Sequence, residues 1–243
     1  AEAYMLREDM GEYKDSQVAL HETVCSAIPR LLDAGVLTSK DVESLFPTLY
    51  LFLKSKDNRI REATWELVVN LASRGAIAKE HARRLLRLLK LKDASKRMDA
   101  WANVPALIGN ALRPEDVRPL VGHYLSLLAS EIEPLRIDAW KSAPALLERG
   151  VVTYGELKPL VKHYLELLKS RRWRDEAWKL LPRLAEKGVV AREHAPFFKE
   201  DLTAQDVDVQ IDLWRNLPAL LDLGILDVND AKPLIRHFLA LLA

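Results

Sequence analysis

The residue types best suited to metal binding recur at equivalent places in this sequence instead of gathering at one. His123, His163 and His237 each follow a proline by four residues within a similar apolar segment. Equivalent positions on neighbouring packed helices lie about 10 Å apart, whereas zinc requires its nitrogen ligands within about 2.1 Å of one ion. We therefore expect these histidines to be half-buried or surface residues, and we expect no metal site.

Acidic residues that could act as general acids or bases recur in the same way. Asp99, Asp138 and Asp212 each lie two residues before a tryptophan, and Glu176 takes that place in a fourth segment. An active-site acid is normally unique, so this repetition indicates a role in the scaffold. The sequence also contains no glycine-rich phosphate loop, no nucleophile elbow and no cysteine-histidine metal spacing. It predicts no catalytic residues and no cofactor.

The elements that carry these residues repeat along the chain. Six positions form one column, separated by 40, 36, 39, 38 and 36 residues: Cys25, Trp65, Trp101, Trp140, Trp178 and Trp214. Four residues later, five of the six copies have a proline: Pro29, Pro105, Pro144, Pro182 and Pro218. Ten residues after the column, five copies have a glycine: Gly35, Gly75, Gly150, Gly188 and Gly224. A fixed period of this length is typical of helical repeat proteins.

Each copy contains two helical patterns. Around Trp140, apolar residues recur every three or four positions, and Gly150 supplies the turn that ends a helix. Thr153 and Glu156 then form a capping-box pattern that opens a second helix. No stretch shows the alternation of a β-strand. The sequence therefore predicts an all-α fold of about twelve helices in six pairs, stacked as a solenoid in one domain over residues 1–243.

The repeated tryptophans and prolines are interpreted as structural. One tryptophan per copy fills the equivalent space between consecutive helix pairs. Pro105, Pro144, Pro182 and Pro218 lie inside the tryptophan-bearing helices, where each removes a backbone hydrogen bond and is expected to bend the helix. Two alternatives remain open: the tryptophans with nearby arginines contact a partner, or the freed tryptophan carbonyls accept hydrogen bonds from a ligand.

Several motifs resemble those of HEAT repeats. The pairs Ile60-Arg61, Leu135-Arg136 and Trp173-Arg174 look like the start of that family's inner helix, and Ala139 and Ala177 follow the last two arginines by three residues. The prolines of "KPLVKHYLELL", "RPLVGHYLSLL" and "KPLIRHFLALL" look like its outer-helix proline. The resemblance implies a right-handed α-solenoid of about six HEAT-like hairpins that acts by binding. Gln210 replaces the arginine in the last copy, and the family's acid before the arginine is displaced or missing, so an acid-arginine ladder between repeats is left open.

Two enzyme classes share the HEAT-like fold. The hydroxylases need several His-Glu dipeptides for a di-iron centre, and here only His21-Glu22 has that order. The alkylpurine DNA glycosylases resemble this chain in length, in helical repeats and in their tryptophan, arginine and aspartate residues. Nucleic-acid binding or DNA repair on this fold is therefore the alternative to a non-catalytic scaffold that binds a protein partner. A third hypothesis is a scaffold, natural or engineered, without a dedicated ligand.

Basic residues supply the candidate partner-binding sites. Four arginines precede their column tryptophans by four residues, a spacing that allows cation-π contacts: Arg61, Arg97, Arg136 and Arg174. Residues 74–97 contain nine basic and two acidic side chains. We select Arg83, Arg84, Arg87 and Lys90 from this segment, and a smaller second patch contains Lys169, Arg171 and Arg172. Solvated helix faces, core packing and head-to-tail contact between molecules are the alternative interpretations.

Composition limits the remaining classes. Thirty-six basic and 35 acidic side chains nearly cancel, so no overall charge favours nucleic acid. The single cysteine, Cys25, cannot form an internal disulfide, and no apolar run reaches the length of a membrane span. We expect a cytoplasmic protein with no membrane partner and no evident small-molecule substrate. Low Asn, Gln and Met content is typical of heat-adapted proteins.

Two local predictions follow from the ends of the repeat pattern. The apolar run within residues 192–208 is brief and ends in an acidic polar segment, so the second helix of that copy should be truncated or broken. The residues up to about Asp15 should cover the apolar face of the first copy, because the end repeats of a solenoid must shield that surface.

Overall fold

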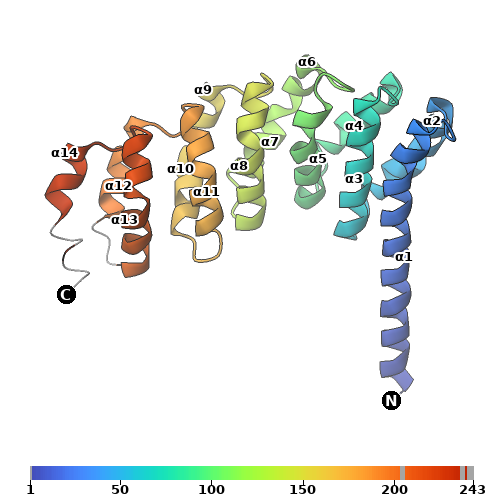
Figure 1. The fold of residues 1–243 in the computed structure, drawn as a ribbon, viewed down its shortest axis with the longest axis horizontal. Coiled ribbons are helices and arrows are strands. Elements are labelled where there is room, and N and C mark those ends of the chain that lie inside the picture. The colour runs from blue at the N-terminus through green and yellow to red at the C-terminus, as the bar shows by residue number, and fades with distance from the viewer. Residues whose placement is uncertain (1, 203–205, 236–238, 240–243) are drawn as a thin grey trace. The chain divides into compact units, whose positions relative to one another are not determined.

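The computed structural model describes the backbone of residues 2–202, 206–235 and 239, and the side chains among these from residue 15 onward. The chain is all-α (Figure 1), as the sequence predicts. Over the described residues it forms no β-strand, and Ile108 and Leu112 make an isolated bridge. None of the helices in this part of the chain combines the length and hydrophobicity that a membrane-spanning segment requires.

The chain divides into two compact units, Ala1–Tyr124 and Leu125–Ala243, here called unit 1 and unit 2. Unit 1 contains α1 (Glu2–Asp33), α2 (Ser39–Phe52), α3 (Asn58–Ser73), α4 (Lys79–Leu88), α5 (Ala94–Leu107), α6 (Pro114–Val117) and the 3₁₀ turn η1 (Arg118–Leu120). Helix α7 (Val121–Leu128) includes the boundary between the units. The single domain expected over residues 1–243 stays a prediction.

Unit 2 repeats the pattern of a tryptophan-bearing helix followed by a shorter helical segment. The tryptophan-bearing helices are α8 (Glu133–Glu148), α11 (Arg174–Glu186) and α13 (Val207–Asp222). The segments that follow them are α9 (Tyr154–Leu157), η2 (Lys158–Leu160), α10 (Val161–Leu165) and η3 (Glu166–Lys169); η4 (Arg192–His194) and α12 (Ala195–Asp201); and α14 (Val228–Ala231) and η5 (Lys232–Leu234).

The predicted helix ends are confirmed. Gly150 follows α8 with a φ of 69°, a left-handed conformation that glycine adopts without the steric cost of a Cβ atom. The backbone N–H and the hydroxyl of Thr153 both donate to Oε2 of Glu156 at 2.7 Å, which forms the predicted capping box. In the third copy Ala111 stands where the others have glycine, and there Gly109 takes the left-handed conformation.

The second helices of three copies are less regular than the sequence suggests. We expected one long helix after Thr153, but α9, η2, α10 and η3 divide it. Pro159 lies in η2, and Pro119 and Pro233 lie in the matching turns η1 and η5. Proline has no N–H to donate to the preceding turn, so the backbone tightens into a 3₁₀ turn at this point.

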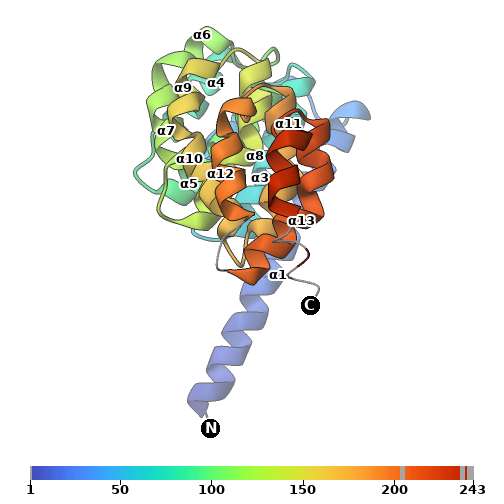
Figure 2. The ribbon, with the colours of Figure 1, turned by 90° about the vertical axis from the view of Figure 1, so that its left-hand side faces the viewer.

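The prolines that follow the column residues by four positions do not interrupt their helices. Pro29 lies within α1, which runs from Glu2 to Asp33 without a break (Figures 1 and 2). Pro144 is likewise inside α8, and the other prolines of this column lie inside α5, α11 and α13. The bend expected at each proline stays a prediction.

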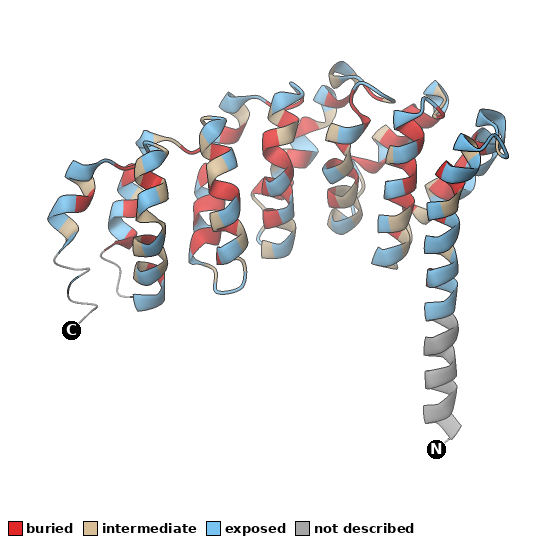
Figure 3. Cartoon of the chain, in the orientation of Figure 1, coloured by how far each residue is buried: buried red, intermediate tan, exposed pale blue. Residues whose placement is uncertain are grey.

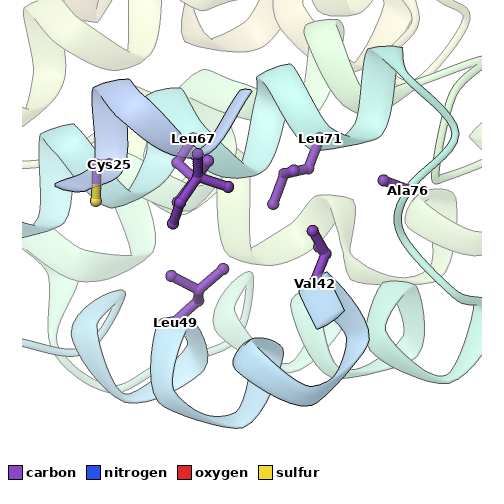
Figure 4. Packing of buried hydrophobic residues seen from close by; sticks show 7 residues of the cluster. Cys25, Val42, Leu49, Leu67, Leu71 and Ala76 are labelled. Atoms are coloured by element: carbon purple, nitrogen blue, oxygen red, sulfur yellow. The ribbon is translucent and has the colours of Figure 1, made fainter. Parts of the chain in front are cut away.

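The core of unit 1 forms where one helix pair covers the next. Leu67 and Leu71 of α3 pack with Cys25 of α1 and with Val42 and Leu49 of α2 (Figure 4). Ile28 and Ala76 complete this cluster. Helix α3 contacts α1 on one side and α5 on the other, so each tryptophan-bearing helix of unit 1 packs beside the next.

In unit 2, buried residues line the facing sides of α8 and α11 (Figure 3). Trp140 and Ala143 of α8 are completely buried, as are Ala177 and Leu184 of α11. The hydroxyl of Tyr164 donates to the carbonyl oxygen of Ala177 at 2.6 Å, which ties α10 to the start of α11.

The two local predictions have different outcomes. The second segment of the fifth copy is short, as expected, since the described residues between 191 and the start of α13 form only η4 and the seven-residue α12. The covering role expected for the residues up to about Asp15 concerns side chains that, before residue 15, lie outside the described part of the chain.

Candidate functional site

The first of the predicted partner-binding arginines is bound inside the fold. Arg61 of α3 donates from Nε to Oδ2 of Asp99 on α5 at 2.5 Å, and only 5% of its side chain is exposed. Its Nη1 donates to the carbonyl oxygens of Ser55 and Lys56 at 3.1 and 3.2 Å. Its Nη2 donates to Oδ1 of Asn58 at 2.7 Å. The guanidinium therefore joins two copies of the repeat and the turn before α3.

Arg174 of α11 makes the same connection in unit 2. Its Nη1 donates to Oδ2 of Asp212 on α13 at 2.5 Å, and 38 residues separate the two. Arg61 and Asp99 are also 38 residues apart. The acid-arginine ladder that the sequence left open is thus present at these two places. Its acids are the aspartates that precede the column tryptophans by two residues.

The other two arginines of this column are also engaged. Arg136 is buried, and its Nη1 lies 3.4 Å from Oε2 of Glu166. Arg97 is half-buried and donates from Nη1 to the carbonyl oxygen of Leu91 at 2.8 Å. None of the four is among the cations that lie over aromatic rings in the described part of the chain.

The structure places all four candidate arginines in buried or half-buried positions within their own units: Arg61, Arg97, Arg136 and Arg174. Their role in binding a partner stays a prediction. A residue four positions before the column lies on the side of the helix that packs toward other elements of the same unit. Carboxylates or carbonyl oxygens are already in place there to accept its hydrogen bonds. Leaving a buried guanidinium without an acceptor would be costly, so these contacts are part of the fold.

A second set of ion pairs joins copies at the other end of these helices. Arg74 donates from Nε and Nη2 to the two carboxylate oxygens of Asp33, each at 2.9 Å. These hydrogen bonds lower the pKa of Asp33. In unit 2, Lys187 pairs with Glu148 at 2.5 Å from the matching positions of α11 and α8. Because both partners are at least partly exposed, each pair adds modestly to stability and fixes the alignment of neighbouring helices.

The column tryptophans become less buried toward the end of the chain. Trp65, Trp101 and Trp140 are buried, whereas Trp178 and Trp214 are half-buried. The indole N–H of Trp101 donates to the carbonyl oxygen of Leu89 at 3.0 Å, and that of Trp140 donates to Leu128 at 3.2 Å. Both acceptors lie twelve residues before the ring, so the two copies use the same contact.

An open groove of about 1140 Å³ lies over the helices of unit 1 that carry the column residues. Helices α1, α3 and α5 all contribute to its wall. Trp65 lines the groove, and its buried indole N–H has no hydrogen-bond acceptor among the described residues. Cys25, in the same column, lines it as well. The groove therefore passes the first two members of the column, Cys25 and Trp65.

The charged groups of the groove leave an acidic surface. Its arginines Arg59 and Arg74 are paired with Asp15 and Asp33, at 2.6 and 2.9 Å. Its unpaired acids are exposed: Glu22 on α1, and Glu62 and Glu66, one turn apart on α3. Within the described side chains these three form no ion pair, although Glu62 accepts a hydrogen bond from Asn58. Arg30 is the groove's remaining base without an ion pair there.

The selected residues of the basic segment form an exposed surface on α4 and the turn after it, called here the surface of α4. Arg83, Arg84, Arg87 and Lys90 are all exposed, and none makes an ion pair with a described residue. Arg83 also lines a second pocket, of about 570 Å³, between α4 and the turn before α6. The structure thus leaves these four cations on the surface of unit 1, in contrast to the arginines of the ladder.

The smaller basic patch is partly occupied. Lys169 pairs with Oδ1 of Asp201 at 2.7 Å, and its Nζ lies 4.4 Å from the centre of the Phe197 ring. Arg171 and Arg172 are exposed. The Arg172 guanidinium lies 5.1 Å from the centre of the Trp173 ring. Two of its three cations are therefore held by neighbours in unit 2.

A small polar cluster lies beside the groove at the first member of the column. The hydroxyl of Thr64 donates to the carbonyl oxygen of Ile60 at 2.6 Å, so His21 Nε2 donates to this hydroxyl at 2.9 Å. The Sγ of Cys25 lies 3.4 Å from the same nitrogen. Burial lowers the pKa of His21 and raises the pKa of Cys25 to about 11. The thiol is therefore protonated and unreactive at neutral pH.

Two further points concern possible metal ligands and the acids of the groove. In the described part of the chain no three His, Cys, Asp or Glu side chains are placed to hold a metal ion. Sequence reasoning missed the groove acids Glu22, Glu62 and Glu66. The spacing of Glu62 and Glu66 on one helix face was an available signal.

Comparisons with known proteins find little. No family model matches the chain, and no curated protein matches it. Among solved structures, the chain is similar to an engineered protein, Northeast Structural Genomics Consortium target OR329, with 19% identity and a TM-score of 0.36 over 84% of this chain and 92% of that one. It is also similar to the consortium's engineered target OR497, with 18% identity and a TM-score of 0.37. That match covers 74% of this chain and about half, 49%, of the other.

Proposed function

We propose that this chain is a non-catalytic, HEAT-like repeat scaffold that binds a protein partner. In the proposed arrangement, six helix pairs stack as a right-handed α-solenoid. The equivalent contacts support it: Arg61 with Asp99 in unit 1 and Arg174 with Asp212 in unit 2 connect consecutive copies through the same positions. Stacked repeats of this kind expose long surfaces formed by many copies.

One observation carries the binding proposal: the groove of unit 1 holds acids that the fold does not use. Two of its three arginines are paired, while Glu22, Glu62 and Glu66 are exposed without an ion pair among the described side chains. A partner segment that presents lysine or arginine would supply the missing charges. Electrostatic complementarity of this kind raises the association rate and selects among partners.

The test uses charge reversal in the groove with a matched control. Glu22→Lys/Glu66→Lys changes two groove acids, and Glu43→Lys/Glu115→Lys changes two exposed acids elsewhere in unit 1. Proteins captured from cell extract on the wild-type chain are identified by mass spectrometry, and the affinity of each purified candidate is measured for all three forms. The proposal expects a partner that the groove variant binds at least tenfold more weakly and the control variant binds normally, because two close charge pairs are lost. A partner that binds all three forms equally contradicts the groove as the site.

Nucleic-acid binding or repair is the second candidate, and the surface of α4 favours it. Arg83, Arg84, Arg87 and Lys90 are exposed without ion pairs among the described residues, which suits them to phosphate contacts. Arg171 and Arg172 offer a smaller exposed patch on unit 2.

Salt dependence separates this candidate from the first. If the surface of α4 binds nucleic acid, DNA or RNA is retained at low salt and released between about 50 and 200 mM salt. Arg83→Glu/Arg87→Glu should abolish retention, while Lys40→Glu/Lys56→Glu, at two exposed lysines of unit 1 outside this surface, should preserve it. No retention of DNA or RNA by the wild-type chain at low salt, or equal loss in both variants, contradicts this candidate.

A further inference from the structure

An exposed apolar stripe lies on the first copy of the repeat. Leu20, Val24 and Leu31 follow one face of α1, with 65%, 47% and 38% of each residue exposed. Val36, in the turn after α1, is 67% exposed. Spacings of four and seven residues place the three helical members on one side of the helix. Exposed apolar side chains aligned on one helix face are typical of interaction surfaces.

The next copy shows what covers such a face. Thr64, Leu71 and Ala76 lie 40 residues after Val24, Leu31 and Val36, at the same positions of the repeat. All three are buried, with Leu71 completely so. Leu71 and Ala76 belong to the cluster formed with Cys25, Ile28, Val42 and Leu49 of the preceding copy (Figure 4). In the first copy, therefore, the stripe is the surface that would face a preceding helix pair.

The last copy exposes the other half of this interface. In the first copy, Phe46 is completely buried and stacks on His81 of the following copy, with ring centres 4.1 Å apart. Ile235 occupies the position of Phe46 in the last copy and is 45% exposed. Val228 of the last copy is equivalent to Arg192 of the fifth copy, which contacts the following α14. Val228 is 66% exposed. Both residues lie where other copies face a following helix pair.

The ladder positions of the first and last copies are also compatible with a contact between them. The ladder joins an arginine in one copy to an acid in the next, as with Arg61 and Asp99. The last copy has Gln210 at the arginine position, and the first copy has Thr23 at the acid position. Bringing these ends together would place two neutral polar groups opposite each other. No uncompensated charge would be buried at this position.

We propose that the chain associates head to tail, with the stripe of Leu20, Val24, Leu31 and Val36 covered by the last copy of a second molecule. The occupant is a second copy because the same chain exposes both complementary faces. The contact would extend across molecules the packing seen between the first two copies. Such a contact is heterologous, so an open assembly of any size keeps one free face of each kind until it closes into a ring.

Sedimentation velocity on the full chain and two single-face variants tests this proposal. Val24→Asp/Leu31→Asp changes the stripe, and Val228→Asp/Ile235→Asp changes the opposite face. All four residues are exposed, so both variants should fold, which circular dichroism verifies. The exposed turn residue Ile132, changed to Asp, provides a control outside both faces.

The expected result is an average mass that rises with concentration from about 1 to about 500 µM for the wild-type chain and the control. Each face variant alone should remain monomeric, because its intact face has no intact counterpart. An equimolar mixture of the two variants should form a one-to-one dimer, since each supplies the face that the other lacks. A wild-type chain that stays monomeric throughout, a face variant that self-associates alone, or a mixture that stays monomeric would overturn the proposal.

Discussion

The Nε atom of Arg61 lies 2.5 Å from Oδ2 of Asp99, and this bond joins α3 to α5 across 38 residues of sequence. Arg174 and Asp212 reproduce it in unit 2 at the same distance and the same separation. A buried ion pair does not by itself imply high stability, because both charges lose their hydration. It does specify alignment, since a shifted helix would leave a buried arginine without its acceptor. The repeated arginine therefore belongs to the architecture of the repeat.

The hydrogen bonds of the tryptophans predict that Trp→Phe substitutions lower the free energy of unfolding by different amounts in different copies. Trp101→Phe should lower the free energy of unfolding by about 1 to 3 kcal/mol, because it removes a buried hydrogen bond and leaves the carbonyl of Leu89 without its donor. Trp140→Phe should behave alike, for the same reason. Urea denaturation followed by circular dichroism measures both.

Trp178 provides the matched control. Its indole N–H is buried and has no acceptor among the described residues, so Trp178→Phe removes an unpaired donor. The loss in the free energy of unfolding should therefore stay below about 1 kcal/mol. Equal losses in Trp101→Phe and Trp178→Phe would contradict a specific role for the bond to Leu89.

Cys25 should react slowly with thiol reagents in the folded protein. Its pKa is raised from 9.0 to about 11, chiefly by burial, which reduces the thiolate fraction about 100-fold. The reaction rate with a disulfide reagent near pH 8, with and without denaturing urea, checks this prediction. Similar rates in the folded and unfolded chain would show that the thiol is accessible and ionises normally.

His21 should make stability depend on pH in a defined direction. Burial lowers its pKa below the ordinary value of 6.5, so the unfolded chain binds the proton more readily than the folded one. The stability that neutral His21 confers is fully present above pH 6.5 and is lost as the pH falls from there through the lower folded-state pKa. Urea midpoints measured at a series of pH values should fall more steeply for the wild type than for His21→Asn. Parallel curves for the two proteins would exclude this role.

Much of the fold follows from local sequence signals. The glycine after α8 and the capping box of Thr153 with Glu156 depend on the chemistry of a few adjacent residues, and both appear as expected. The column tryptophans are buried in the first copies that carry them because large rings at a helical spacing fill interhelical space. The divided second helices were less evident, since the sequence places Pro159 within an otherwise continuous helical pattern.

The candidate site depends on contacts between copies, which sequence spacing does not supply. Arg61 and Arg83 are both arginines on amphipathic helices, yet the first is bound to Asp99 and the second is exposed. The difference arises from which side of each helix meets another copy. The groove acids could not be predicted from the sequence for a related reason. Glu66 is without a basic partner because Arg59 and Arg74 pair with other acids, which only the structure shows.

A double-mutant cycle on Arg61 and Asp99 tests most directly whether the repeated arginines hold copies together. Arg61→Met alone should lower the free energy of unfolding by about 3 kcal/mol, because it breaks a buried pair and leaves the partner uncompensated. With Asp99→Ala and the double variant, the cycle should give a coupling energy of about 1 to 3 kcal/mol, and the Arg174–Asp212 cycle should match it. Coupling within about 0.5 kcal/mol of zero at both pairs would contradict the account.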